Sequence, residues 1–564
     1  MNIHSDRFLF KPWKLGVIGI CVTITVAAAV LLETAPPIGP WVDLYSAYAF
    51  LWVLIGFAVI GLTLLIAYRP LPQPLAVIIS LLIGSLVIGI SRQWDVPFGV
   101  RDPWRHISII ISRDLSPQVN PYPALHALVA VLETVIGTSP KSVLAGVPVL
   151  AFTVCLIFVA ATFGRVTSSE RIAQLALLIT IPAGFVGFIA RPFTLAVPFI
   201  VLVYWLVTAR LSRQPHTILL LLFGIVTLLL HPVVAIICLI VLVGVSTIQV
   251  VDRLSIGGTT TYLVGIIFRP NVARDTAVMS IFTAVYIFYF TGTFLLTVYR
   301  FAVSSNAESG GTVQSSAGIL AEIIPNIVEF IIRTSYPIGL GILACLSLLI
   351  GIRRRRINKI TAISLFTTAG IAAFFILQNF VPAIRFGVAR VVYLVPLVLV
   401  PAALRGLEFN RGKFGWVVKI ALVVLIVTAG LVTAYESDIT GGIQYGTSQA
   451  QVEGYHWLQD YRGNDNVIGS GSTFWIAEAE FGAETANEWS RGRSARYYYK
   501  NREEPFPWLV ADSGKSIYAV SGFARARAYQ YATGGGERYF IRSLMKFQNN
   551  RSRIYDNGNL RMYR

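Results

Sequence analysis

Charged residues are scarce in this chain of 564 residues: 13% are Asp, Glu, Lys or Arg, whereas 55% are hydrophobic. Soluble globular proteins carry about twice that share of charge, so the composition excludes that class and indicates a protein with many membrane spans. Cysteine is also rare. All four cysteines (Cys21, Cys155, Cys238, Cys345) lie inside apolar runs, so we expect small core residues and neither a disulfide framework nor a zinc site.

Two nucleotide-binding patterns are missing as well. The chain has neither a Walker A loop nor a G-x-G-x-x-G unit on a βαβ pattern, which are the usual phosphate cradles of nucleotide-binding proteins. The sequence therefore does not support the use of ATP or of a nucleotide sugar.

Apolar stretches long enough for a membrane helix recur along the chain. A span needs roughly 20 mostly apolar residues, and about thirteen stretches approach this. The expected spans are 15–32, 45–67, 73–90, 142–163, 172–190, 193–209, 217–230, 232–250, 276–299, 332–352, 360–378, 389–405 and 415–434. A proline at position 232 explains the break between two of them, because proline removes a helix hydrogen bond.

The net charge of +18 follows the loops between these spans. Every second loop is basic, from Arg69 to the run Arg353–Arg356 and beyond, and such loops face the cytoplasm under the positive-inside rule. We therefore predict a cell-membrane protein with a cytoplasmic N-terminus. The positive charge is explained by this topology. We expect the protein to contact membrane lipids and expect no nucleic acid as a partner.

The same pattern predicts two domains. Residues 1–434 form an α-helical polytopic membrane domain with a large outer loop, 91–141, and an interfacial helix, 124–137, which is too short to span. Residues 435–564 form a small extracytoplasmic α/β domain. Within it we expect a helix over 448–463, a strand and turn in "NVIGSGS", and a hairpin around Asp556-Asn557-Gly558.

The outer loop gathers polar and aromatic residues. "QWDVPFGVRDPWRH" contains Asp95, Asp102 and His106, and a carboxylate there can accept the proton of an attacking hydroxyl or hold a divalent cation such as Mg²⁺ or Mn²⁺. Asp102 and His106 are four residues apart and share one face if the segment is helical. A solvated loop whose charges avoid lipid is the alternative.

The order of these features resembles the GT-C class of membrane glycosyltransferases, which use polyprenyl- or dolichyl-phosphate sugars and include protein mannosyltransferases and oligosaccharyltransferases. The resemblance is carried by "RDPWRH", "NPYPALHALVAVLETVIG", "ARPFTLAVP", the His231 turn and "EGYHWLQDY". It implies an archaeal-type enzyme of the cell envelope that transfers a sugar, with inversion, to a glycan, lipid or protein. Asp102 matches the catalytic base or metal contact of the class. Because the acidic loop follows the third span here, whereas the class has it after the first, Asp95 stays a second candidate.

The remaining candidate residues also lie on the predicted outer side. Arg191, Arg385 and Arg390 suit a lipid phosphate, since guanidinium groups bind phosphate oxygens in pairs; snorkelling interface residues are the alternative. The substrate-binding candidates are Trp104, Tyr122, His126 and His231. For His106, His126 and His231, a histidine that only satisfies its hydrogen bonds is the alternative.

Two other functions remain open from the sequence. A transporter or lipid flippase would place ionisable residues near the middle of the membrane, whereas here the centres of the spans are nearly free of charge. A non-catalytic assembly or receptor protein would use its outer domain to bind a partner. The substitution Asp102→Asn discriminates between these functions and sugar transfer.

Overall fold

A computed structural model provides the structure of the chain. It describes residues 12–34, 44–92, 106–107, 109–111, 123–167, 169–185, 192–208, 213–254, 262–264, 272–289, 327–378, 389–408, 413–432, 449–463, 465–469, 471–482, 485, 516–521, 552–556 and 560–563.

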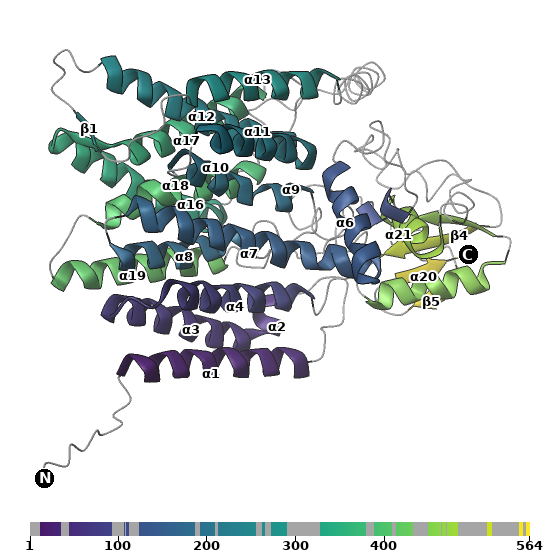
Figure 1. Cartoon of the computed structure of the whole chain (residues 1–564). Coiled ribbons are helices and arrows are strands. Elements are labelled where there is room, and N and C mark those ends of the chain that lie inside the picture. The colour runs from purple at the N-terminus through teal and green to yellow at the C-terminus, as the bar shows by residue number, and fades with distance from the viewer. Residues whose placement is uncertain are drawn as a thin grey trace, which may run out of the picture.

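Long helices lie side by side in a bundle, and a small domain adjoins one end of it (Figure 1). The bundle helices are α1 (Pro12–Glu33), α2 (Leu44–Ala47), α3 (Ala49–Tyr68), α4 (Gln73–Arg92), α7 (Pro140–Val166), α8 (Glu170–Phe185), α9 (Pro192–Ala196), α10 (Pro198–Thr208), α11 (Arg213–Leu230), α12 (Pro232–Leu254), α13 (Val272–Tyr289), α16 (Ile327–Arg353), α17 (Lys359–Gln378), α18 (Ala389–Leu407) and α19 (Lys413–Val432). Each of the thirteen expected spans overlaps at least one of these helices.

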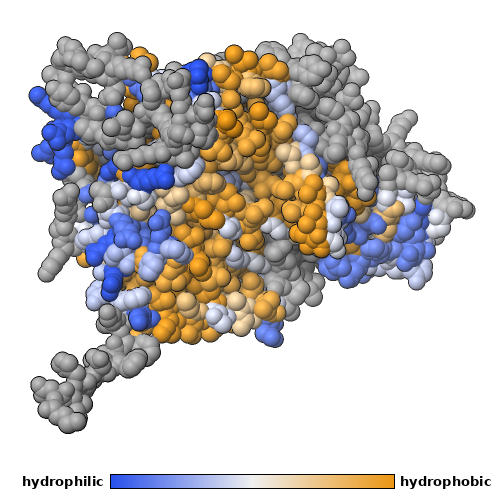
Figure 2. Space-filling model, in the orientation of Figure 1, coloured by the Kyte–Doolittle hydropathy of each residue, from blue (hydrophilic) through white to orange (hydrophobic). Residues whose placement is uncertain are grey.

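Seven described helices are long and apolar enough to cross a membrane. They are Trp13–Glu33, Ala49–Tyr68, Gln73–Ile90, Pro140–Val166, Pro232–Val251, Thr334–Arg353 and Gly415–Val432. Figure 2 shows an orange apolar belt over the bundle with blue polar surface at both ends. The chain is therefore a multi-pass membrane protein, while the count of thirteen spans stays a prediction.

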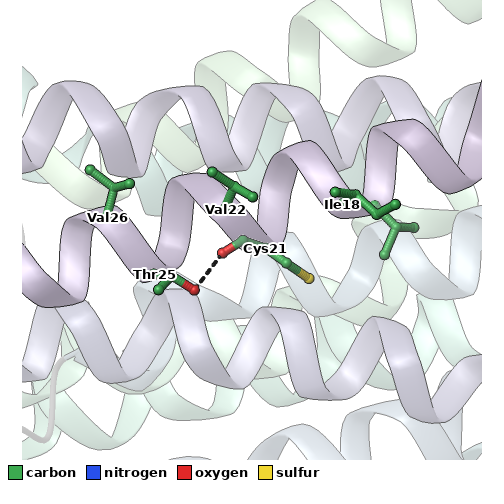
Figure 3. A pocket seen from close by; sticks show the side chains of 6 residues that line it. Ile18, Cys21, Val22, Thr25 and Val26 are labelled. Carbon is green, nitrogen blue, oxygen red and sulfur yellow. Dashed lines mark hydrogen bonds between the residues drawn. The ribbon is translucent and has the colours of Figure 1, made fainter.

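The face of α1 that points away from the bundle is apolar, as a surface in contact with lipid must be. Figure 3 shows a shallow pocket there, lined by Val17, Ile18, Cys21, Val22, Thr25 and Val26. The Thr25 hydroxyl donates to the Cys21 carbonyl at 2.9 Å, so its polar group is satisfied within the helix. Cys21 is half-buried and Cys345 is exposed. The expectation of core cysteines thus holds for Cys155 and Cys238 only, because an apolar run does not specify which face looks at lipid.

Basic side chains join helix ends at the end of the bundle opposite the small domain, which we call the basic end. Arg171 donates to the Tyr68 carbonyl at 3.3 Å, so α8 begins where α3 ends. Arg405 on α18 donates to the Val166 carbonyl at the end of α7. Arg171 and Arg405, two of the loop arginines, thus lie at one end, as the charge pattern predicts. The side of the membrane that this end faces stays a prediction.

At the opposite end, which we call the domain end, several helices begin with a proline. Ser139 caps α7 by accepting from the Ser142 amide at 3.3 Å, and Pro140 takes the first helical position. The predicted break at His231-Pro232 is confirmed, with α11 ending before it and α12 beginning at Pro232. A short helix, α6 (Pro123–Ile136), occupies the expected interfacial segment and contacts α7, α9 and α11.

The small C-terminal domain is mixed α/β, as predicted. Strands β3 (Asn466–Gly469), β4 (Ser516–Ser521), β5 (Arg553–Asp556) and β6 (Leu560–Tyr563) form a sheet in the order β3-β4-β6-β5. Strands β3 and β4 are parallel and the other two pairs are antiparallel. Helix α20 (Gln449–Tyr461) contacts β6, and α21 (Gly471–Phe481) contacts β3. A second sheet pairs β1 (Tyr262–Val264) with β2 (Arg356–Asn358).

Two local predictions for this domain are confirmed and one is wrong. Helix α20 and the left-handed Gly463 after it, at φ +58°, occupy the expected segment. The final hairpin is β5 paired with β6. In "NVIGSGS" the strand is present, but the expected turn is the start of α21. Small polar residues favour helix starts as well as turns, and the apolar and Ala/Glu-rich residues that follow decide for the helix.

Candidate functional site at the domain end

The predicted site residues divide into two groups. Asp95, Asp102, Trp104, Tyr122, Arg191 and Arg385 lie outside the described residues, and so does the side chain of Arg390 on α18. His106, His126 and His231 are described, and all three are buried, with 8%, 1% and 3% of their surfaces exposed. These three histidines define the part of the site whose geometry is known.

His106 and His126 form a direct pair. His106 begins a short helical segment with Ile107 and residues 109–111, whereas His126 lies on the inner side of α6 between the buried Leu125 and Val129. The His106 Nδ1 atom lies 2.9 Å from the His126 Nε2 atom, and the ring centroids are 5.0 Å apart. The sequence predicts both residues at the outer end but not this contact, because nothing local links residues twenty positions apart.

His231 belongs to the same end of the bundle. It sits between α11 and α12 and meets the Phe193 ring of α9 edge to face, with centroids 5.1 Å apart. Helix α6, which carries His126, contacts both α9 and α11. The three segments quoted for the resemblance, around His126, Phe193 and His231, are therefore neighbours in space.

The histidine pair can hold a proton between two rings. In the 2.9 Å contact one nitrogen donates and the other accepts, so at most one ring is an imidazolium while the contact lasts. A second proton would place an N–H group against an N–H group and break it. The pair can therefore orient one ring, or relay one proton, in the interior of the protein.

The pair also fits a divalent cation as far as its donor atoms go. Neutral imidazole nitrogens are common ligands of divalent metal ions. In this contact the two nitrogens face each other, so both rings would have to turn toward a shared ion. The described residues contain no group of three metal-ligating side chains. A carboxylate from the loop before His106, Asp102 or Asp95, would have to complete such a site.

A second polar cluster attaches the C-terminal domain to the bundle, and the sequence did not predict it. Glu480 on α21, whose side chain is 8% exposed, pairs with Lys141 in the first turn of α7 through one carboxylate oxygen. His456 on α20 lies 3.4 Å from the other oxygen. The three residues are far apart in the sequence. Of the three, only His456 belongs to a motif singled out from the sequence, "EGYHWLQDY". This carboxylate positions α20 and α21 beside the domain end.

Comparisons with known proteins give one similar solved structure. No protein-family model matches the sequence, and no curated protein matches it either. In structure, the chain is similar to the oligosaccharyltransferase of Archaeoglobus fulgidus, solved in complex with Zn and sulfate, at 13% identity and a TM-score of 0.45. The similarity covers 86% of this chain and 72% of that one. That enzyme belongs to the class that the sequence motifs resemble. At this level of likeness, it carries no conclusion about the activity of this chain.

Proposed function

We propose that the protein is a membrane glycosyltransferase that takes a sugar from a polyprenyl-phosphate-linked donor and transfers it to an acceptor at the domain end. The observation that carries the proposal is the contact between His106 and His126. It joins "RDPWRH" to "NPYPALH", the two segments on which the resemblance to the GT-C class chiefly depends. It does so beside Phe193 and His231.

Each step of the reaction has a candidate group in this region. Asp102, four residues before His106, would accept the proton of the acceptor hydroxyl while that oxygen attacks the sugar and the lipid phosphate departs. His106, held by His126, would orient this carboxylate. Arg191 directly precedes α9, and Arg385 and Arg390 lie before and in the first turn of α18, where guanidinium groups can stabilise the leaving phosphate.

In the alternative arrangement, Asp102 and the two histidines would hold a divalent cation, and Asp102 would then act as a metal ligand and not as the base. The cation would supply positive charge that polarises the phosphate of the donor. Trp104 and Tyr122 would provide aromatic faces for the sugar. The acceptor, whether glycan, lipid or protein, would approach from the C-terminal domain, which we place outside the cell, with the N-terminus in the cytoplasm.

A matched pair of variants tests the proposal. Cells that lack the protein are complemented with wild type, Asp102→Asn or Asp95→Asn, and their glycans are analysed at equal membrane levels of protein. We expect Asp102→Asn to lower transfer by roughly 10²–10⁴-fold, the usual contribution of a general base, and Asp95→Asn to stay near wild type. The reverse result would move the base to Asp95.

The remaining outcome contradicts the enzyme assignment. If neither variant nor loss of the protein changes any glycan, the transferase proposal fails. A transporter or flippase then becomes the better hypothesis, and it predicts altered movement of a lipid-linked glycan across the membrane. Removing divalent cations with a chelator and restoring Mg²⁺ or Mn²⁺ tests the metal separately: recovery of transfer supports it, and unchanged transfer removes the metal from the proposal.

A further inference from the structure

Cations and tryptophans alternate at the basic end, far from the histidine pair. The indole of Trp13, at the start of α1, carries the guanidinium of Arg69 at 5.3 Å from its ring centroid, and the ammonium of Lys14 lies 6.0 Å away. Arg69 directly follows α3. Two separate helices therefore build this first half of the cluster.

Trp416, at the start of α19, builds the second half. The guanidinium of Arg171 on α8 lies 5.5 Å from its ring centroid and the ammonium of Lys419 lies 4.8 Å away. Arg171 also donates to the carbonyl of Tyr68, the residue before Arg69, at 3.3 Å. This hydrogen bond joins the halves into one cation–indole band. The band consists of Trp13, Lys14, Arg69, Arg171, Trp416 and Lys419.

Three cations of the band, Lys14, Arg69 and Arg171, differ from the arginines that form ion pairs within the bundle. Other arginines of the bundle pair with acids: Arg274 with Asp275 at 3.2 Å, and Arg405 with Glu408 at 2.5 Å. Lys14, Arg69 and Arg171 form no ion pair with any carboxylate in the part of the chain that the structure describes. Their charge can therefore be met by a ligand from outside the chain.

The geometry suits a phosphate at the membrane surface. An arginine stacked on an indole keeps its N–H edge free to bind phosphate oxygens, and tryptophan side chains settle at the headgroup level of a bilayer. The band is also continuous with apolar surface: Leu15 and Ile18 on α1 and Leu64 on α3 are exposed. An acyl chain whose phosphate rests on the band can follow these side chains into the membrane.

We propose that the cation–indole band is a binding site for the phosphate headgroup of an anionic phospholipid in the leaflet at the basic end. A surface that is only positively charged attracts anionic lipid in proportion to its total charge, whichever arginines supply that charge. A specific binding site depends instead on the particular arginines that contact the phosphate. The proposal is independent of the catalytic one, since the site lies at the other end of the bundle.

Lipid retention in nanodiscs provides the test. Purified full-length protein is placed in phosphatidylcholine nanodiscs that contain spin-labelled phosphatidylglycerol or spin-labelled phosphatidylcholine, and the immobilised fraction is measured. We expect wild type to immobilise phosphatidylglycerol in a saturable manner. A hydrogen bond between a charged group and a phosphate oxygen contributes roughly tenfold in affinity, so Arg69→Gln with Arg171→Gln should weaken retention roughly 100-fold.

The matched control removes two charges from the same end without touching the band. Arg353 and Arg356 are exposed, so Arg353→Gln with Arg356→Gln should leave retention nearly unchanged. Equal losses in both double variants, or no preference for phosphatidylglycerol in wild type, would overturn the proposal. Where the band variant does not fold, Lys14→Gln at an exposed position replaces it, with an expected loss of roughly tenfold. Unchanged retention in that variant would also overturn the proposal.

Discussion

The Nδ1 atom of His106 and the Nε2 atom of His126 lie 2.9 Å apart, although twenty residues separate them in the sequence. The contact ties the segment that leads from "RDPWRH" to the inner face of α6. Both rings are buried, so the contact is shielded from water and fixes the distance between α6 and the short segment that begins at His106.

A double-mutant cycle measures this contact. Removing one buried partner of a hydrogen bond costs about 1–3 kcal/mol, so His106→Ala and His126→Ala should each lower the free energy of unfolding in detergent by about that amount. The double variant should cost less than the sum, because the second substitution has no contact left to break. Strictly additive losses would mean that the rings do not interact.

The ion pair of Lys141 with Glu480 predicts how the C-terminal domain is held. Lys141→Met should raise hydrogen exchange in α20 and α21, because Glu480 loses its cation while it stays nearly buried. Lys141 is partly exposed, so we expect a loss of about 1 kcal/mol in the stability of the domain.

Arg561→Gln serves as the control for that experiment. Arg561 pairs with Asp556 at 3.0 Å, and both residues belong to the C-terminal sheet. Hydrogen exchange in α20 and α21 of the Arg561→Gln variant should match that of wild type. Equal increases in both variants would show that loss of any ion pair loosens the domain and that Lys141 has no special part in it.

Features with a local cause were predictable from the sequence. The break at His231-Pro232 follows from the chemistry of proline, and α20 with its glycine cap follows from a run of about four turns. The final hairpin follows from Asp556-Asn557-Gly558 between two alternating runs. Each of these depends on residues within a few positions of one another.

The site was predictable only as a set of residues on one side. Charge alternation places His106, His126 and His231 at a common end, but it cannot predict which ring meets which. The Glu480 cluster and the cation–indole band depend on helices that pack together from distant parts of the chain. Their contacts are decided by packing, which leaves no periodic signal in the sequence.

Tyr455 predicts alkaline sensitivity of the C-terminal domain. Burial removes a phenolate from water and so raises the pKa of Tyr455, against the opposing hydrogen bonds from Thr473 and Gln451. Below the pKa of an unfolded tyrosine, about 10, Tyr455 is neutral in both states and its contribution to stability is complete. As the pH rises from there through the higher pKa of the folded state, the unfolded chain loses its proton more readily, and this contribution is lost. The unfolding temperature of the domain should therefore fall above about pH 10.

Tyr455→Phe removes that titration. At neutral pH the variant should be about 1 kcal/mol less stable, because the phenol lies 3.0 Å from the Thr473 hydroxyl. Its unfolding temperature should then depend less on pH above about 10 than that of wild type. Parallel curves for the two proteins would assign the alkaline loss to other groups.

Two glycines give opposite predictions for the packing of α16 against α18. A Cβ atom at Gly406 would lie 2.4 Å from the backbone carbonyl oxygen of Leu343, which cannot move aside without shifting a helix. At Gly341 nothing lies within 4 Å of such an atom. Gly406→Ala should therefore destabilise the bundle by about 1–3 kcal/mol, measured as unfolding in a denaturing detergent.

Gly341→Ala is the matched substitution on the other helix. Alanine favours a helix interior over glycine by about 1 kcal/mol, and with open space around it the change should leave stability equal or slightly higher. The same chemical change thus has opposite signs because only Gly406 lets two helix backbones approach each other. A loss at Gly341 as large as that at Gly406 would mean that α16 and α18 are packed in a different register from the one described.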